Sequence, residues 1–279
     1  MTRPHPVRHR GFGLIEFLIA IALTLFLVAG LATIYLSNEQ GSVAQRAEAA
    51  LADNIRLAVT LLTTDIRQTG YRWDLSEPVG QMFTIIPDYE ADPTAFLATP
   101  SNPLIMGDWA NTGSSLPYGL AASFQSDGTL SNCQGQLVPI GAIDTDVWKV
   151  NKATDQLECK SRISTINNNA FDSYVPLVNN VETMMVRFGV DTQNTGSVSA
   201  YVSAPNVDVY SQILSVQLAL VMVSGNPAAP QGDVGDVLPT PAQGGYDLLG
   251  MTYTPSTPPD RYLRIVVVRD IALKNLLAD

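Results

Sequence analysis

The sequence predicts an α+β fold in which one long N-terminal α-helix, with its first half in a membrane, packs on an antiparallel β-sheet. Three observations predict this arrangement. A continuous apolar stretch lies near the N-terminus, no proline occurs between Pro6 and Pro78, and strand-like runs separated by turn residues follow in the second half of the chain. A helix followed by antiparallel strands is typical of α+β proteins. The length of 279 residues suits one globular domain with an additional segment, or at most two small domains.

The apolar stretch runs from Phe12 to Leu36 and contains a single ionisable side chain, that of Glu16. As an α-helix it would be roughly 37 Å long, whereas the hydrocarbon core of a bilayer is about 30 Å thick. We therefore expect a transmembrane helix over residues 12–36. Three arginines precede it, which places the N-terminus in the cytoplasm and the rest of the chain in the periplasm or outside the cell. These arginines are Arg3, Arg8 and Arg10.

Apolar residues recur at helical spacing beyond the membrane segment, so the helix is expected to continue over residues 37–70. They lie four, four, three, four and four positions apart, which places them on one face that packs on the sheet. These residues are Ala47, Leu51, Ile55, Ala58, Leu62 and Ile66. Gly41 is an expected weak point, and Gly70 an expected end of the helix. A β-rich domain over residues 71–279 follows.

Two pairs of apolar runs predict β-hairpins, because each pair flanks a short polar stretch. The pairs are 146–150 with 156–160, and 184–190 with 198–202. Residues 213–223, ILSVQLALVMV, predict a central strand whose apolar face begins at Leu214.

The other parts of this domain carry weaker signals. Residues 78–130 are rich in turn residues, and loops with edge strands are expected there. Residues 224–260 contain seven prolines and predict a long surface excursion. The segments 262–268 and 271–277 predict two final strands.

The composition excludes several functional classes. The formal charge is −10, so the clustered basic residues that nucleic acid contacts require are missing. Both histidines, His5 and His9, precede the apolar stretch. If that segment is removed, histidine-based acid–base catalysis and histidine-ligated metal sites are unavailable to the mature chain. We therefore expect no catalytic residue, no metal site and no cofactor.

The two cysteines, Cys133 and Cys159, are too few for a four-thiolate metal site and most simply form a disulfide. An exported domain permits such a bond. Closing the 26-residue separation would stabilise the fold by about 3 to 4 kcal/mol in the chain-entropy model. A reactive redox pair is the alternative, although the Cys-x-x-Cys spacing typical of such pairs is missing.

Glu16 is a candidate functional residue because a carboxylate in an apolar membrane helix costs about 2.5 to 3.5 kcal/mol on insertion scales. The alternative is that it lies close enough to the headgroups to stay hydrated. Its surroundings, Arg10-Gly11-Phe12-Gly13-Leu14-Ile15-Glu16-Phe17, resemble the class III signal of type IV prepilins. The resemblance implies that a prepilin peptidase cleaves between Gly11 and Phe12, removes residues 1–11 as a leader and methylates the new amine of Phe12.

Cleavage would create a cationic amine at Phe12, four residues before Glu16. In a bundle of parallel helices, the carboxylate of one subunit can pair with the amine of its neighbour, which fixes an axial offset of one subunit. Removing the three leader arginines would give the mature chain a formal charge of (16 − 3) − 26 = −13.

Residues 51–71, LADNIRLAVTLLTTDIRQTGY, resemble the segment that follows the membrane helix in the PilW family of type IV pilus assembly proteins. Further resemblances lie at 177–191, 201–202, 213–223 and 261–275. The resemblance implies a pilin-like fold and a minor pilin that helps to prime fibre growth, supporting twitching motility, adhesion and DNA uptake. The implied partners are the prepilin peptidase, other minor pilins, the major pilin and a large tip-associated adhesin-like protein. The implied location is the inner membrane, in a single pass, and then the pilus fibre near its tip at the cell surface.

Four alternatives remain open. A minor pseudopilin of type II secretion would share the signal, helix and sheet, and a membrane-anchored periplasmic enzyme or binding domain would need only the anchor. A secretory signal cleaved after Ala44 would have an apolar region of about 7 to 15 residues, shorter than the one present. Asp191-Thr192-Gln193-Asn194-Thr195-Gly196 could bind calcium, but the loop lacks the complete ligand pattern and a polar hairpin turn is favoured.

Overall fold

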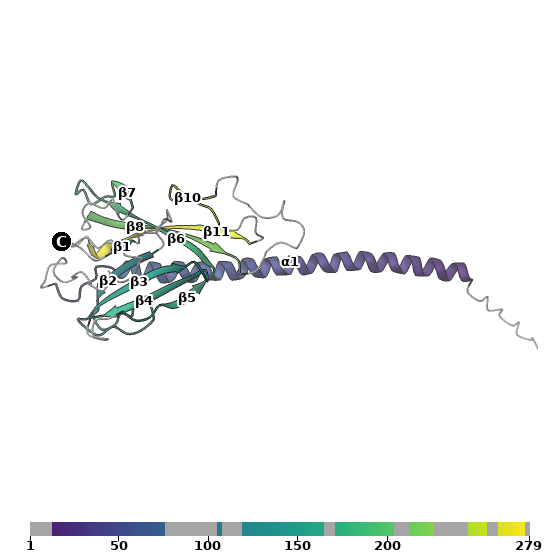
Figure 1. Ribbon diagram of the computed structural model, residues 1–279, viewed down its shortest axis with the longest axis horizontal. Coiled ribbons are helices and arrows are strands. Elements are labelled where there is room, and N and C mark those ends of the chain that lie inside the picture. The colour runs from purple at the N-terminus through teal and green to yellow at the C-terminus, as the bar shows by residue number, and fades with distance from the viewer. Residues whose placement is uncertain are drawn as a thin grey trace, which may run out of the picture. The chain divides into compact units, whose positions relative to one another are not determined.

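The computed structural model describes residues 13–75, 105–107, 119–164, 171–203, 212–225, 245–255 and 262–276. The chain divides into two compact units, one up to Arg46 and the other from Ala47 onward. The predicted long helix is confirmed as α1 (Leu14–Gln68), which continues through Gly41 and contributes residues to both units (Figure 1).

The first unit consists of the N-terminal part of α1. Every side chain from Gly13 to Leu36 is exposed, although most are apolar. An 18-residue window of α1 reaches a mean hydropathy of 2.6, so the helix is long and apolar enough to cross a membrane.

In the second unit α1 ends at Gln68, and two contacts satisfy backbone groups at this end. Gly70 has a φ of 75°, a left-handed conformation that glycine adopts readily, and its N–H donates to the Ser123 carbonyl at 2.9 Å. The side-chain amide of Asn275 donates to the carbonyls of Arg67 and Thr69 at 3.0 and 3.2 Å. The helix end is therefore joined to a strand and to the C-terminal segment.

Five antiparallel strands form the first sheet, in the order β1-β2-β3-β4-β5 (Figure 1). They are β1 (Ile105–Gly107), β2 (Gly119–Gln125), β3 (Ile143–Asn151), β4 (Gln156–Ile163) and β5 (Val175–Asn179). The hairpin predicted from 146–150 and 156–160 is confirmed as β3 and β4. The strand β2 is fully buried and lies inside the sheet, so the expectation of only loops and edge strands in 78–130 is wrong there.

Four antiparallel strands form the second sheet, in the order β11-β8-β6-β7. They are β6 (Val181–Val190), β7 (Ala200–Val202), β8 (Ile213–Val223) and β11 (Arg264–Ala272). The hairpin predicted from 184–190 and 198–202 is confirmed as β6 and β7, and the predicted central strand as β8.

One expectation about the C-terminal part is wrong. Residues 262–268 and 271–277 do not form two strands, because β11 continues through Arg269 and Asp270 and the 3₁₀ helix η5 (Lys274–Leu276) follows. The Pro-rich excursion contains a hairpin of β9 (Tyr246–Leu248) and β10 (Met251–Tyr253). Leu248 packs with Met185, Ala219 and Val221 of β6 and β8, which anchors this hairpin on the second sheet.

One apolar core joins α1 to both sheets. The helix contributes the predicted face with Leu51, Ala58, Leu62 and Ile66, which is confirmed as buried. The same core contains Trp148 of the first sheet and a row of β8 residues in the second. That row is Val216, Leu218, Leu220 and Met222. The sequence predicts one sheet on the helix, whereas the structure has two, and both pack against α1.

Candidate functional site

Glu16 lies in the first turn of α1. Its Oε2 accepts a hydrogen bond from the backbone N–H of Gly13 at 3.1 Å. A carboxylate in the first turn is stabilised by the positive end of the helix dipole. Gly11 and Phe12, between which cleavage is predicted, lie outside the described residues, and pairing between Phe12 and Glu16 of different subunits stays a prediction.

Cys133 and Cys159 are joined by a disulfide, with their Cα atoms 6.4 Å apart. Cys159 is fully buried on β4, whereas Cys133 lies in the irregular segment between β2 and β3. The bond therefore attaches that segment to the first sheet. Among the described residues, the group of three metal-ligand side chains that lies close together is Cys133, Asp146 and Cys159. Because both sulfur atoms are in the disulfide, neither offers a thiolate to a metal.

Replacing both cysteines by serine should lower the free energy of unfolding by about 3 to 4 kcal/mol, since the unfolded chain regains the entropy of the open loop. Urea unfolding of the full chain in detergent, followed by tryptophan fluorescence, would measure the loss. The parent chain unfolded in a thiol reductant should show a similar loss. An unchanged urea midpoint in both experiments would contradict a stabilising role for the bond.

Three buried carboxyl groups interact with one another, and one of them, Asp146, lies beside the disulfide. Asp65 comes from α1, and Asp144 and Asp146 come from β3. Their exposed fractions are 5%, 0% and 0%. The indole Nε1–H of Trp148 donates to Asp65, the Ser161 hydroxyl donates to Asp144 at 2.7 Å, and the Cys133 backbone N–H donates to Asp146 at 2.9 Å. The other carboxyl oxygen of Asp144 and the other one of Asp146 are buried and have no hydrogen-bond partner.

Burial raises the pKa of all three carboxyl groups, because the charged form is poorly solvated in the core. It raises the pKa of Asp65 to about 6, although the hydrogen bond from Trp148 opposes the rise. It raises the pKa of Asp144 to about 7, against the hydrogen bond from Ser161. The pKa of Asp146 rises well above its ordinary value through burial and then through the charges of Asp65 and Asp144. The Asp146 carboxyl group therefore holds a proton more tightly than an exposed carboxyl group does.

Sequence reasoning missed this cluster, although two signals for it exist. Asp65 lies three positions after Leu62 and directly before Ile66, so it belongs to the apolar face of the helix. Asp144, Asp146 and Trp148 alternate on β3 and therefore share a face. A carboxyl group on a core face is rare unless it is paired.

A cavity of about 470 Å³ opens at the end of the second unit where β11 begins. Five separate segments line it, namely the β3–β4 turn, the β5–β6 junction, the end of β8, the end of β10 and the start of β11. Of its lining residues, sequence reasoning singled out none as a site, because they are distant in the chain and carry no motif.

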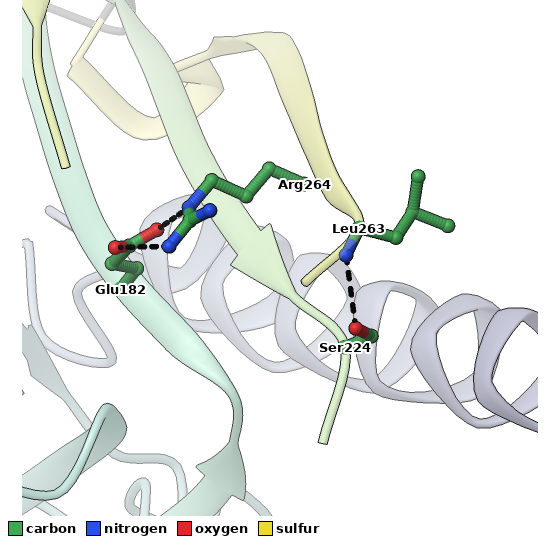
Figure 2. A network of polar contacts seen from close by, with 4 residues as sticks. All are labelled: Glu182, Ser224, Leu263 and Arg264. Atoms are coloured by element: carbon green, nitrogen blue, oxygen red, sulfur yellow. Dashed lines mark hydrogen bonds and ion pairs between the residues drawn. The ribbon is translucent and has the colours of Figure 1, made fainter. Parts of the chain in front are cut away.

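An ion pair between Arg264 and Glu182 lies in the wall of this cavity (Figure 2). The Nε–H and an Nη2–H of Arg264 donate to the two carboxylate oxygens of Glu182 at 2.6 and 3.1 Å. The side chains of Arg264 and Glu182 are only 8% and 12% exposed. The Leu263 N–H donates to the Ser224 hydroxyl (Figure 2), at a distance of 3.0 Å. The Ser224 N–H donates to the Leu263 carbonyl at 2.8 Å.

Two further titratable groups line the cavity. Burial raises the pKa of the Tyr253 hydroxyl, and the charge of Glu182 and a hydrogen bond to it add to the rise. Burial also raises the pKa of Asp155, as does the charge of Glu182, while the charge of Arg264 opposes the change. Glu182 therefore interacts with each of the other three groups and links them into one network.

The loop considered for calcium is a hairpin turn between β6 and β7. Asp191 Oδ2 accepts a hydrogen bond from the Gly196 N–H at 2.6 Å, and Oδ1 accepts one from the Gln193 N–H at 3.1 Å. Burial alone would raise the pKa of Asp191, but these backbone donors lower it below its ordinary value. The carboxylate is thus occupied in stabilising the turn.

Residues 146–275 match the model of the family described as Type IV Pilus-assembly protein W. The matched range contains the resemblances noted between 177 and 275, whereas residues 51–71 lie outside it. No curated protein matches the chain. Among solved structures, a type IV-like pilin from Thermus thermophilus is similar, with 16% sequence identity and a TM-score of 0.47. The similarity covers 81% of this chain and 98% of that chain.

Proposed function

We propose that this chain is a minor pilin that enters the pilus and helps to prime its assembly. The observation that carries the proposal is the match of residues 146–275 to a family of type IV pilus assembly proteins. The apolar N-terminal helix supports it further, because a pilin needs a segment that is stable both in the membrane and among other pilin helices. Enzymatic activity forms no part of the proposal.

Priming has a physical rationale. The first subunits of a helical polymer lack most of their neighbours, so starting the polymer costs more free energy than extending it. A preassembled group of minor pilins offsets that cost by presenting a formed end to the next subunit. We propose that this chain acts in such a group, together with other minor pilins, the major pilin and a tip-associated adhesin-like protein.

The proposed maturation places Glu16 at the fifth position of the mature chain. A prepilin peptidase at the inner membrane would cleave after Gly11 and methylate the amine of Phe12. That amine would pair with Glu16 of an adjacent subunit. N-terminal sequencing and mass determination of the mature protein test this step directly. A native chain that begins at Met1, or after residue 44, would refute it.

Glu16→Ala should reduce the amount of the subunit in isolated fibres by about tenfold or more, because a loss of roughly 1.4 kcal/mol at one subunit contact already shifts an equilibrium tenfold. Membrane insertion and the fold of the second unit should be unchanged, since Glu16 lies in the first unit. Immunoblots of sheared fibres and of membranes would measure both quantities.

The matched control is Glu39→Ala, which removes a second exposed carboxylate from α1. It should leave incorporation near the parent level. Wild-type amounts of the Glu16→Ala protein in fibres would contradict the pairing role. Recovery of secretion-system components instead of pilus components in a pulldown would favour the type II secretion pseudopilin.

A further inference from the structure

We propose that the cavity at the start of β11 binds an uncharged saccharide unit of a polysaccharide. This site lies within the second unit and does not depend on the proposed role in the pilus. The proposal follows from the size of the cavity, the balance of its charges, the chemistry of its walls and their rigidity.

The size of the cavity suits one or a few sugar rings. Its volume of about 470 Å³ lies within the range of roughly 300–1,000 Å³ that is typical of small-molecule sites. Because turn, strand and hairpin segments from both sheets meet at its walls, the cavity exists only in the folded unit. Sites at such junctions are common locations for ligand binding.

The charges of the cavity balance. Lys152 and Arg264 contribute two cations, and Asp155 and Glu182 contribute two carboxyl groups. Arg264 and Glu182 also engage one another through two hydrogen bonds. A cavity without excess charge gives no electrostatic preference to an anion or a cation. An uncharged polar ligand is therefore favoured over a phosphate, a metal ion or a charged peptide.

The remaining walls match the hydrogen-bonding chemistry of a sugar. Hydroxyl groups both donate and accept hydrogen bonds, and a side-chain amide does the same through separate atoms. Saccharide hydroxyls have this dual character, so one wall can serve several of them. The lining residues that carry such groups are Thr154, Asn180, Ser224, Tyr253, Thr254 and Tyr262.

Tyr262 supplies an aromatic surface at the cavity and is 38% exposed. A tyrosine side chain combines the apolar face of its ring with a polar hydroxyl. The C–H face of a sugar ring can pack on the tyrosine ring while the sugar hydroxyls reach the polar wall of the cavity. A saccharide can therefore use the aromatic surface and the polar wall at the same time.

The walls are held in place before any ligand binds. The paired hydrogen bonds between Ser224 and Leu263 fix the end of β8 against the start of β11, and the Val223 N–H donates to the Asn180 carbonyl at 2.9 Å. A Cβ atom at Gly225 would lie 3.1 Å from the Asn180 amide, so a side chain there would crowd this junction. Such preorganisation reduces the ordering cost of binding.

The test uses the full chain in detergent on an array of neutral hexose, N-acetylhexosamine and uronic acid oligosaccharides. We expect binding to a neutral oligosaccharide, confirmed by calorimetric titration in solution. Tyr262→Ala should weaken that binding at least about tenfold, which corresponds to about 1.4 kcal/mol. Trp73→Ala is the matched control, because it removes an exposed aromatic side chain that is not part of the cavity.

Both variants should melt close to the parent temperature, since both side chains are exposed. Thr254→Val is a second variant that removes a hydroxyl from the wall and should also weaken binding. The proposal is overturned if no neutral oligosaccharide binds, if uronic acid oligosaccharides bind more tightly than neutral ones, or if Tyr262→Ala and Thr254→Val both bind like the parent.

Discussion

We expect the free energy of unfolding of the full chain to fall by several kcal/mol when the pH is raised from about 4 to about 7. The buried carboxyl groups of Asp65, Asp144 and Asp146 cause this loss, because burial raises the pKa of each in the folded state. In the unfolded chain they release their protons near pH 4. Between the unfolded and folded pKa values the folded state binds more protons, so stability decreases as the pH rises.

The pH range of this loss follows from the folded pKa values of the individual carboxyl groups. Stability is fully present below about pH 4 and is lost as the pH rises through the folded pKa of about 6 for Asp65 and about 7 for Asp144. The raised pKa of Asp146 adds a loss in the same direction. Each pKa unit of difference corresponds to about 1.4 kcal/mol for one group. Urea unfolding of the full chain at a series of pH values would measure the dependence.

Asp146→Asn should make this dependence shallower, because it removes one of the three ionisable groups with a raised pKa from the core. Asp53→Asn is the matched control, since Asp53 lies on α1 but is exposed. It changes the net charge equally and so accounts for general charge repulsion. Equal pH dependence in the two variants would contradict the role of the buried cluster.

Arg264→Gln should destabilise the second unit by about 3 to 5 kcal/mol, because it leaves the Glu182 carboxylate buried without its cation. For a unit of this size the loss corresponds to a decrease in melting temperature of roughly 10 °C. Thermal unfolding followed by circular dichroism in detergent would measure it. The effect is large because both side chains are mostly shielded from water.

Arg269→Gln is the matched control, since Arg269 lies on the same strand, β11, and is exposed. It should shift the melting temperature little. The double variant Glu182→Gln/Arg264→Gln should cost less than the sum of the two single variants, because the uncompensated charge is removed as well. Additive losses would show that the pair does not interact in the folded protein.

The strands that could be predicted have strong local patterns. In β8 the apolar residues occupy both alternating faces, which is typical of a central strand, and the structure buries both faces. The strand β2, GLAASFQ, was missed because it contains no β-branched residue. In β11, Arg269 and Asp270 interrupt the apolar run and suggested a break, but an edge strand accommodates exposed charges.

The amino-acid sequence by itself determined the long helix, its apolar N-terminal part with Glu16, the helical face with Leu51 and Leu62, and the strands with clear alternation. These features depend on residues that are near one another in the chain, so their periodicity is visible without a structure. Only the tertiary structure decided that two sheets share one core, that Asp65 meets Asp144 and Asp146, and that Arg264 pairs with Glu182. Asp65 and Trp148 are 83 positions apart, and Glu182 and Arg264 are 82 apart. Contacts at such separations arise from how the elements pack, which no local pattern specifies.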